Sequence, residues 1–255
     1  MTRVFLMVLC CAAVALRAEE KKEEKKKEPP RVTALIPLGL VPGETNALRV
    51  RGLNLTNATE IRFDSKSGVT VVIGSREKTK VPDKQDVKKV GDTQLDLQLH
   101  LPADALPEST TFVVVGPDGE SEPRRLLFLK KETTIAEKEP NGSFREAQRI
   151  QFGQTVQGLI QEPNDVDVFA FEAAAPEKIA VEIQADSLGS PMDSILTLYD
   201  SQRHIVATSD DSGSSHDSRL AVNLAAAGAY LISVIDAHDQ GGPAHAYLLT
   251  LRHAD

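Results

Sequence analysis

Short runs of alternating hydrophobic and polar residues, separated by turn-forming residues, dominate the pattern of residues 31–131. Residues 95–100 (LDLQLH) alternate strictly, and residues 111–115 (TFVVV) form a buried-type run that ends at the turn sequence GPDG. Alternation with a period of two is typical of a half-buried strand. The charged segment from Lys78 to Lys89 contains Pro82 and is predicted to be an exposed loop. The other strands expected here are residues 47–52, 69–73 and 125–129.

This spacing of strands, without a convincing amphipathic helix, predicts a small β-sandwich for residues 31–131. Further strands are expected after it, among them residues 166–171, 205–209 and 220–224. At 255 residues the chain exceeds the usual size of one domain. We therefore predict an all-β protein with two β-sandwich domains in series, residues 31–131 and 137–255, joined by a short connector near Lys130 to Ala136.

The N-terminus carries a pattern for export. Arg3 precedes an apolar run from Val4 to Leu16, and small residues follow, so residues 1–18 are predicted to be a secretory signal peptide. The run is short for a bilayer span, and an uncleaved membrane anchor is the alternative. Residues 19–30 (EEKKEEKKKEPP) are predicted to be a solvated tether. We expect a secreted, periplasmic or cell-surface protein with no transmembrane segment in its mature chain.

Cysteine use and charge point to a metal rather than to covalent cross-links. Cys10 and Cys11 both lie in the predicted signal peptide, so the mature chain would have no disulfide, and core burial or a bound metal must stabilise it. The net charge of −8 is uneven, because residues 137–255 alone contain seven basic and eighteen acidic residues. This excess disfavours nucleic acid as a partner and suits a cation, although surface carboxylates also serve solubility.

Two groups of oxygen-bearing side chains form a candidate calcium site. Glu137 and Glu139 are two residues apart, so an extended segment would direct both carboxylates to one side, and Asn141 adds an amide oxygen. Asp165 and Asp167 share a face in the same way at the start of the strand expected over residues 166–171. Calcium takes six to eight oxygen ligands, which these residues and backbone carbonyls can provide. The alternative is that Asn141 caps the segment 143–150 and that the acids are only solvated.

A second acidic group comprises Asp193, Asp210, Asp211 and Asp217. Residues 210–213 (DDSG) also form a turn signal between the strands expected at 205–209 and 220–224. Aspartate side chains commonly bond the backbone in such turns, so a role in shaping the loops is the favoured interpretation. A second cation at this group is the alternative.

No motif predicts an enzyme. Ser215, His216 and Asp217 are adjacent in sequence, but adjacency does not make a catalytic triad, and neither a Gly-x-Ser-x-Gly nor a His-Glu-x-x-His sequence occurs. The six histidines lack the spacing of zinc ligands. There is no tryptophan, and Tyr199, Tyr230 and Tyr247 lie in apolar strand patterns that favour core packing. A protein ligand is therefore easier to defend than a sugar.

The first predicted sandwich contains four moderately specific motifs: PRVTALIP at 30–37, the turn at Gly43, VRGLNL at 50–55 and GPDGES at 116–121. With these motifs it resembles an immunoglobulin-like domain of the IPT/TIG type over about 100 residues. It implies a fold, that of a spacer or an interaction module, rather than a function.

Residues 137–255 contain a succession of short motifs: EPN at 139–141, AQRI at 147–150, VQG at 156–158, DVDVF at 165–169, DSILTLYD at 193–200, SDDS at 209–212, DSRL at 217–220, GAYLISV at 228–234 and YLL at 247–249. With these motifs the second predicted sandwich resembles the bacterial pre-peptidase C-terminal (PPC) domain over residues 137–255. The resemblance implies a β-sandwich that is appended to secreted peptidases and other extracellular proteins and is related to the collagen-binding domains of bacterial collagenases. Those relatives hold calcium near the N-terminus of the domain, which implies ligand roles for Glu137, Glu139, Asn141, Asp165 and Asp167.

These observations favour a secreted, calcium-stabilised binding or accessory protein without catalytic residues. Its expected partner is an extracellular protein or a cell-envelope component. The first alternative is a structural component of the cell envelope without a dedicated ligand, and a more distant one is an accessory subunit of a secreted peptidase. Calcium at Glu137 and Glu139 would tie the connector onto the second sandwich and so fix the angle between the domains.

Overall fold

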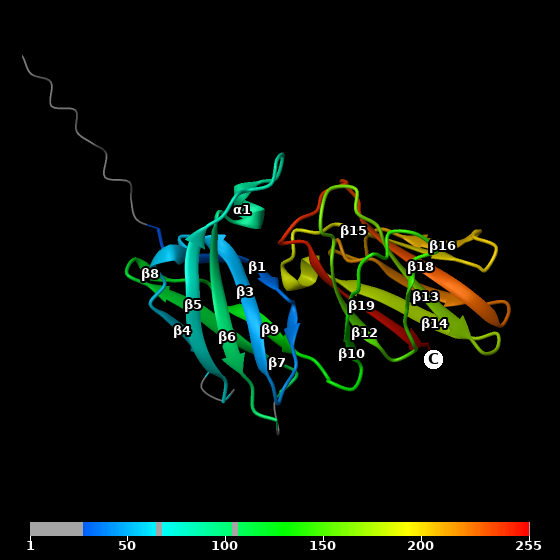
Figure 1. Ribbon diagram of the computed structural model, residues 1–255, viewed down its shortest axis with the longest axis horizontal. Coiled ribbons are helices and arrows are strands. Elements are labelled where there is room, and N and C mark those ends of the chain that lie inside the picture. The colour runs from blue at the N-terminus through cyan, green and yellow to red at the C-terminus, as the bar shows by residue number, and fades with distance from the viewer. Residues whose placement is uncertain (1–27, 65–67, 104–106, 255) are drawn as a thin grey trace, which may run out of the picture.

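The computed structural model describes residues 28–64, 68–103 and 107–254. These residues form two β-sandwiches that lie side by side, the first drawn in blue to green and the second in green to red (Figure 1). The predicted signal peptide, residues 1–18, and all but the last three residues of the predicted tether lie outside the described residues. The helical turns of the described residues are too short to cross a lipid bilayer.

The first sandwich consists of two sheets that enclose one apolar core. Leu95, Leu97 and Leu99 of β6 are fully buried, as strict alternation predicts, and they pack in one cluster with Phe112 and Val114 from the opposite sheet. One sheet has the order β1 (Arg31–Ile36), β3 (Thr45–Leu53), β6 (Thr93–His100) and β5 (Thr70–Lys78). The other has the order β2 (Gly39–Leu40), β9 (Arg124–Phe128), β7 (Ser109–Gly116) and β4 (Glu60–Phe63), with β8 (Gly119–Glu120) paired to β7; a single turn of 3₁₀ helix, η1 (Leu55–Asn57), precedes β4.

The predicted loop from Lys78 to Lys89 contains more regular structure than expected. Strand β5 extends to Lys78, and the segment ends in a single helical turn, α1 (Val87–Val90). Asp86 caps this turn by accepting a hydrogen bond from Lys88 N at 2.9 Å. The buried side chain of Arg51 donates to Val90 O at 2.9 Å and to Gly91 O at 3.0 Å. The turn therefore forms because a buried cation from β3 holds its C-terminal end, which local sequence patterns do not reveal.

The second sandwich consists of two five-stranded sheets around a single core. Tyr247, Leu249 and Leu251 of β19 pack in this core with Phe169 and Ile232 from the opposite sheet. One sheet has the order β10 (Thr134–Ala136), β12 (Thr155–Leu159), β19 (Ala246–His253), β14 (Lys178–Gln184) and β17 (Arg219–Asn223). The other has the order β11 (Gln148–Arg149), β13 (Asp167–Ala173), β18 (Gly228–Asp236), β15 (Ser194–Tyr199) and β16 (Ile205–Ser209), and η2 (Asp186–Leu188) follows β14.

Part of the predicted connector belongs to the second sandwich. Residues 134–136 form β10, which pairs in parallel with β12 from Thr134 opposite Thr155 to Ala136 opposite Gln157. Only residues 129–133 lie between the last strand of the first sandwich and β10. The connector is therefore shorter than the predicted range of Lys130 to Ala136, and the second sandwich begins at Thr134. A strand of three residues shows too little alternation to be recognised in the sequence.

An apolar interface joins the two sandwiches. The outer face of β19 presents Ala246 and Leu248, which form a buried cluster with Leu38 of the first sandwich. Ala244, just before β19, packs in a second buried cluster with Ala34 and Val90. Hydrogen bonds from Gln85 Nε2 to Gly241 O (2.7 Å) and from Arg124 Nη2 to Leu188 O (3.2 Å) cross the same interface. Apolar contacts thus hold the two sandwiches together without any contribution from the predicted calcium site.

Candidate metal centre

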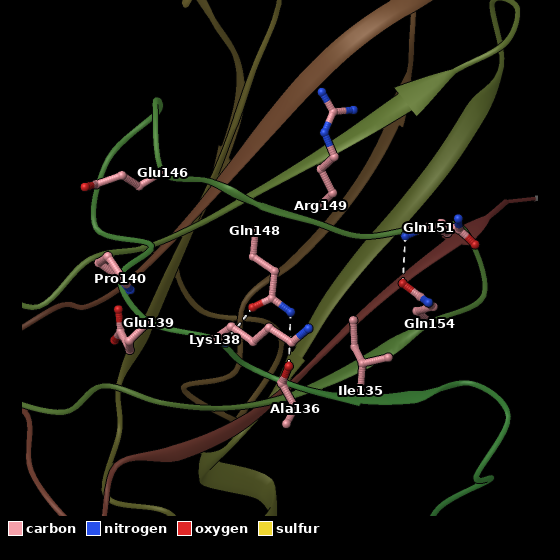
Figure 2. A pocket seen from close by; sticks show the side chains of 10 residues that line it. All are labelled: Ile135, Ala136, Lys138, Glu139, Pro140, Glu146, Gln148, Arg149, Gln151 and Gln154. Carbon is pink, nitrogen blue, oxygen red and sulfur yellow. Dashed lines mark hydrogen bonds between the residues drawn. The ribbon is translucent and has the colours of Figure 1, made fainter.

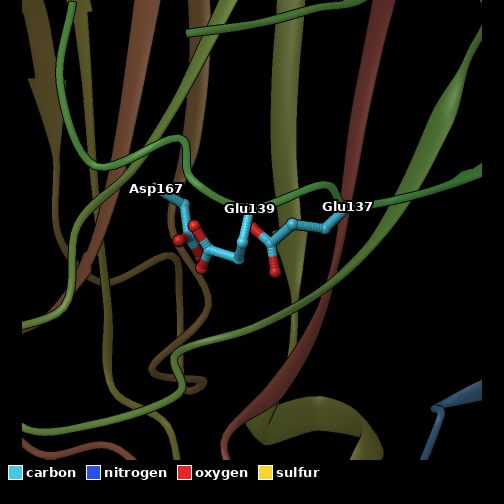
Figure 3. A group of neighbouring side chains, drawn as sticks. All are labelled: Glu137, Glu139 and Asp167. Atoms are coloured by element: carbon cyan, nitrogen blue, oxygen red, sulfur yellow. The ribbon is translucent and has the colours of Figure 1, made fainter. Parts of the chain in front are cut away.

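Three of the predicted ligand residues converge where the chain crosses from one sheet of the second sandwich to the other. Glu137 follows β10, Glu139 lies in the crossing segment, and Asp167 is the first residue of β13 (Figure 3). One carboxylate oxygen from each of the three lies within 4.8 Å of the others. Asp167 is fully buried, Glu137 half-buried and Glu139 exposed, so the group is open to solvent on one side.

The hydroxyl group of Tyr247 lies between two of these carboxylates. Its oxygen is 2.8 Å from Glu137 Oε1 and 2.6 Å from Asp167 Oδ2. A phenol has one proton to donate, so only one of these contacts can be its hydrogen bond. The other contact requires a proton on a carboxyl group or a nearby cation. Burial, together with the charge of Glu137, raises the pKa of Asp167 to about 9, which makes Asp167 the group that holds the proton when no cation is bound.

Asn141 is fully buried and organises the crossing segment. Its Nδ2 donates to Glu137 Oε1 at 3.0 Å, its backbone N–H donates to Glu139 Oε2 at 2.9 Å, and its carbonyl oxygen accepts from Val168 N at 3.0 Å. Residues 143–150 contain no helix, and Asn141 Oδ1 accepts no hydrogen bond from them, so Asn141 does not cap this segment. The asparagine instead links both glutamates to β13.

Two buried oxygens of the site have no hydrogen-bond partner, namely Asn141 Oδ1 and Asp167 Oδ1. A buried acceptor without a partner costs free energy, and nearly all such groups in folded proteins are paired. A hard cation would satisfy both oxygens, because it binds amide and carboxylate oxygens together. The residues present therefore fit a calcium ion.

Asp165 occupies a different position from the other four predicted residues. Its Oδ2 accepts from Gln161 N at 2.6 Å and its Oδ1 accepts from Val166 N at 3.0 Å, and it is not one of the three converging carboxylates. Asp165 closes the turn that begins at Glu162, just before β13, and both of its carboxylate oxygens accept backbone N–H groups of neighbouring residues. It still acts on the site through its charge. Burial is the largest cause of the raised pKa of Glu139, and the charges of Asp165 and Glu137 raise this pKa further.

Sequence reasoning placed Tyr247 in the core and missed its hydroxyl group as part of the site. The ring is fully buried, as predicted, and lies across Gly158 of β12, where a Cβ atom would overlap it. Buried tyrosines usually find a hydrogen-bond partner, and this was the available signal. The sequence alone does not say which of several acids that partner is.

The second acidic group divides into two parts. Asp193, Asp210 and Asp211 each place one oxygen within 4.8 Å of the others, and His216 and His238 each place Nδ1 3.4 Å from Asp193 Oδ2. Asp217 lies apart from them. Its carboxylate accepts from the backbone N–H groups of residues 185, 186 and 187 and so fixes η2. Ser215, His216 and Asp217 therefore direct their side chains to different partners and do not assemble as a triad.

A broad polar groove opens beside the carboxylates, at the side of the sandwich where β10 and β11 are the edge strands (Figure 2). Its volume is about 750 Å³. Glu139 and Pro140 form its wall next to the candidate metal centre. The remaining lining residues are Ile135, Ala136, Lys138, Glu146, Gln148, Arg149, Gln151 and Gln154.

Comparison with protein families matches residues 165–235 to the bacterial pre-peptidase C-terminal domain. The expected PPC domain is therefore confirmed for these residues, and such a domain fits a non-catalytic binding or accessory role of the kind found in extracellular bacterial proteins. Comparison with curated protein sequences gives no match.

Several solved structures share part of the fold at low similarity. The PPC domain of a Bacillus anthracis collagenase is 21% identical, with a TM-score of 0.35, and the match covers 46% of this chain and all of that one. SGBP-B of a Bacteroides ovatus mixed-linkage glucan utilization locus, solved in complex with a mixed-linkage heptasaccharide, is 9% identical with a TM-score of 0.26, and the match covers 78% of this chain and 71% of that one. The secreted serine protease VesC of Vibrio cholerae is 10% identical with a TM-score of 0.28, and the match covers 84% of this chain and 47% of that one.

Proposed function

We propose that the chain is an exported, calcium-stabilised accessory protein that binds an extracellular protein. The PPC match at residues 165–235 supports the accessory role, and the convergence of Glu137, Glu139 and Asp167 around unpaired buried oxygens supports the calcium. In this proposal the first sandwich is an IPT/TIG-type spacer or interaction module, and residues 1–18 direct export.

The calcium would bind Glu137, Glu139, Asp167 and the Oδ1 atom of Asn141, and Asp165 would contribute through its charge. Bound there, the ion would neutralise three acidic groups that otherwise repel one another. It would also link the end of β10 to the start of β13, which belong to different sheets. With no cysteine among the described residues, the ion would stabilise this side of the sandwich in place of a covalent cross-link.

Two features support a protein ligand rather than a carbohydrate. The groove beside the site has no aromatic residue in its lining, whereas sugars are commonly bound on aromatic platforms. Its carboxamide and charged side chains suit the peptide groups and polar side chains of a polypeptide.

The structural alternative also has an observation in its favour. Among the described residues only four large hydrophobic side chains are exposed, none of them is aromatic, and only two of them are neighbours in the sequence, so neither sandwich presents a large exposed apolar patch. Together with the apolar interface between the sandwiches, this suits a stiff spacer in the cell envelope. The four residues are Val72, Val87, Ile205 and Val206.

Thermal unfolding in EDTA and in millimolar calcium tests the calcium site. Calcium is expected to raise the midpoint of the wild-type protein, because an ion that binds only the folded state stabilises it. The variant Glu139→Gln with Asp167→Asn should lose that rise. Glu172→Gln is the matched control, because Glu172 is an exposed carboxylate on the same strand as Asp167. An equal rise in all three proteins would place calcium elsewhere, and no rise in the wild type would remove calcium from the proposal.

A further inference from the structure

The edge of β10 is covered by a side chain that imitates a neighbouring strand. The carboxamide of Gln148 donates from Nε2 to Ala136 O at 3.0 Å and accepts from Lys138 N at Oε1 at 2.7 Å (Figure 2). In a sheet, the backbone of an adjacent strand likewise donates to the carbonyl oxygen of one residue and accepts from the N–H of the residue two positions later. The carboxamide therefore makes the same pair of hydrogen bonds as a neighbouring strand would. The side chain thus occupies a place where a strand could pair.

The pairing of β10 with β12 leaves this edge directed into the groove. Thr155 N donates to Thr133 O at 2.8 Å and Glu137 N donates to Gln157 O at 3.0 Å, so the odd-numbered residues face β12. Backbone groups alternate in direction along a strand, and Ala136 and Lys138 therefore direct their N–H groups away from β12. Both residues line the groove and are exposed.

We propose, building on the binding role above, that an extended segment of a protein ligand lies in this groove and adds to the edge of β10, displacing the Gln148 carboxamide. Extended peptides commonly bind by adding a strand to an exposed sheet edge, where main-chain hydrogen bonds provide affinity and side-chain pockets provide specificity.

The chemistry of the groove defines the kind of segment it accepts. Two cationic residues, Lys138 and Arg149, and two anionic ones, Glu139 and Glu146, balance its charge, and three glutamines supply further donors and acceptors. Apolar atoms contribute at least as much of the lining surface as polar atoms do, and Ile135, Ala136 and Pro140 are the apolar residues among them. The segment that fits is accordingly of low net charge, carries both polar and apolar side chains and is free of proline at the pairing positions, because proline lacks the N–H that a strand needs.

The test measures binding of a positional-scanning library of short biotinylated peptides to the full chain and to three variants. Ala136→Pro removes the outward N–H and leaves the hydrogen bonds to β12 in place, and proline is tolerated at such an edge position. Ala136→Ser is its matched control, since it keeps the N–H. We expect Ala136→Pro to weaken binding of the selected peptides by about tenfold or more, because the variant loses one hydrogen bond to the ligand strand. Ala136→Ser should bind like the wild type.

Gln148→Ala provides a readout that does not depend on the folding of the proline variant. Removing the internal competitor is expected to tighten peptide binding several-fold, whereas weaker binding would mean that Gln148 itself holds the ligand and would overturn the proposal. Equal binding by Ala136→Pro and Ala136→Ser would overturn it as well and would move the ligand to another surface. Failure of every peptide to bind would refute the groove site, while the calcium-dependent unfolding described above would still test the calcium proposal separately.

Discussion

Replacing Asp167 by asparagine is expected to stabilise the calcium-free protein and to abolish its response to calcium. Burial and the adjacent charge of Glu137 raise the pKa of Asp167 to about 9. Without a cation this carboxyl group must therefore hold a proton at neutral pH. Asparagine has nearly the same shape and is neutral at every pH, so the substitution removes that requirement and also removes a ligand.

The magnitude follows from the pKa of Asp167. Because its pKa in the folded protein lies above the ordinary value of 3.8, its contribution to stability is fully present below about pH 3.8 and is lost as the pH rises towards 9. Each pH unit in that window corresponds to about 1.4 kcal/mol, which gives an upper limit of about 4 kcal/mol at pH 7. Burial of the asparagine amide offsets part of this, and we expect a net gain of about 1 to 3 kcal/mol in EDTA.

Urea unfolding at several pH values, in EDTA and in calcium, measures both effects. In EDTA the wild type should lose stability relative to Asp167→Asn between about pH 5 and about pH 8, a range of about 3 pH units in which the pKa shift of Asp167 acts. In calcium the wild type should instead be the more stable of the two proteins. Glu172→Gln, an exposed substitution on the same strand, should behave like the wild type throughout. The reasoning would be refuted if Asp167→Asn were less stable than the wild type in EDTA at pH 8, or if it kept the full calcium response.

Three further outcomes are expected. His245 is fully buried, neither of its ring nitrogens is hydrogen-bonded, and burial lowers its pKa. The free energy of unfolding should therefore fall as the pH drops below about 6.5, by up to about 1.4 kcal/mol per pH unit, and His245→Met should weaken this pH dependence in urea unfolding. Leu248→Ala should cost about 2 to 5 kcal/mol and broaden the interdomain distances measured by small-angle scattering even in calcium; unchanged scattering would contradict the role of the interface. Gly158→Ala should displace the ring of Tyr247 and reduce the calcium-induced rise in unfolding midpoint, whereas a full rise would show that the ring position is unimportant to the site.

The fold class could be predicted because alternation reports directly on burial. Leu95, Leu97 and Leu99 follow a period of two and are all buried in one core, and the all-β prediction is confirmed. Strand β10 escaped prediction because its three residues are identified only by pairing with β12, a contact that the sequence does not encode locally. The same limit applies to α1, which depends on hydrogen bonds from the distant Arg51.

The candidate site shows a similar division between local and tertiary information. Residue chemistry and the PPC resemblance were enough to nominate Glu137, Glu139, Asn141 and Asp167, which the fold brings together. The position of Asp165 depends on the turn before β13, where both its oxygens accept backbone N–H groups. Tyr247 lies more than one hundred residues from Glu137 in the sequence, at a separation of 110, and only the pairing of β19 with β12 brings its hydroxyl group to the carboxylates.

The side of the second sandwich that packs against the first sandwich differs from the side that carries the carboxylates. On the outer face of β19, Ala246 and Leu248 are buried against Leu38 of the first sandwich. Apolar packing therefore sets the angle between the sandwiches. The carboxylates lie instead between β10 and β13, on the side where the two sheets end in short edge strands. An ion there would act on the crossing segment and on the wall of the groove, to which Glu139 also belongs. The earlier expectation that calcium fixes the interdomain angle is therefore better replaced by the proposal that calcium holds the edge of β10 in place for its ligand.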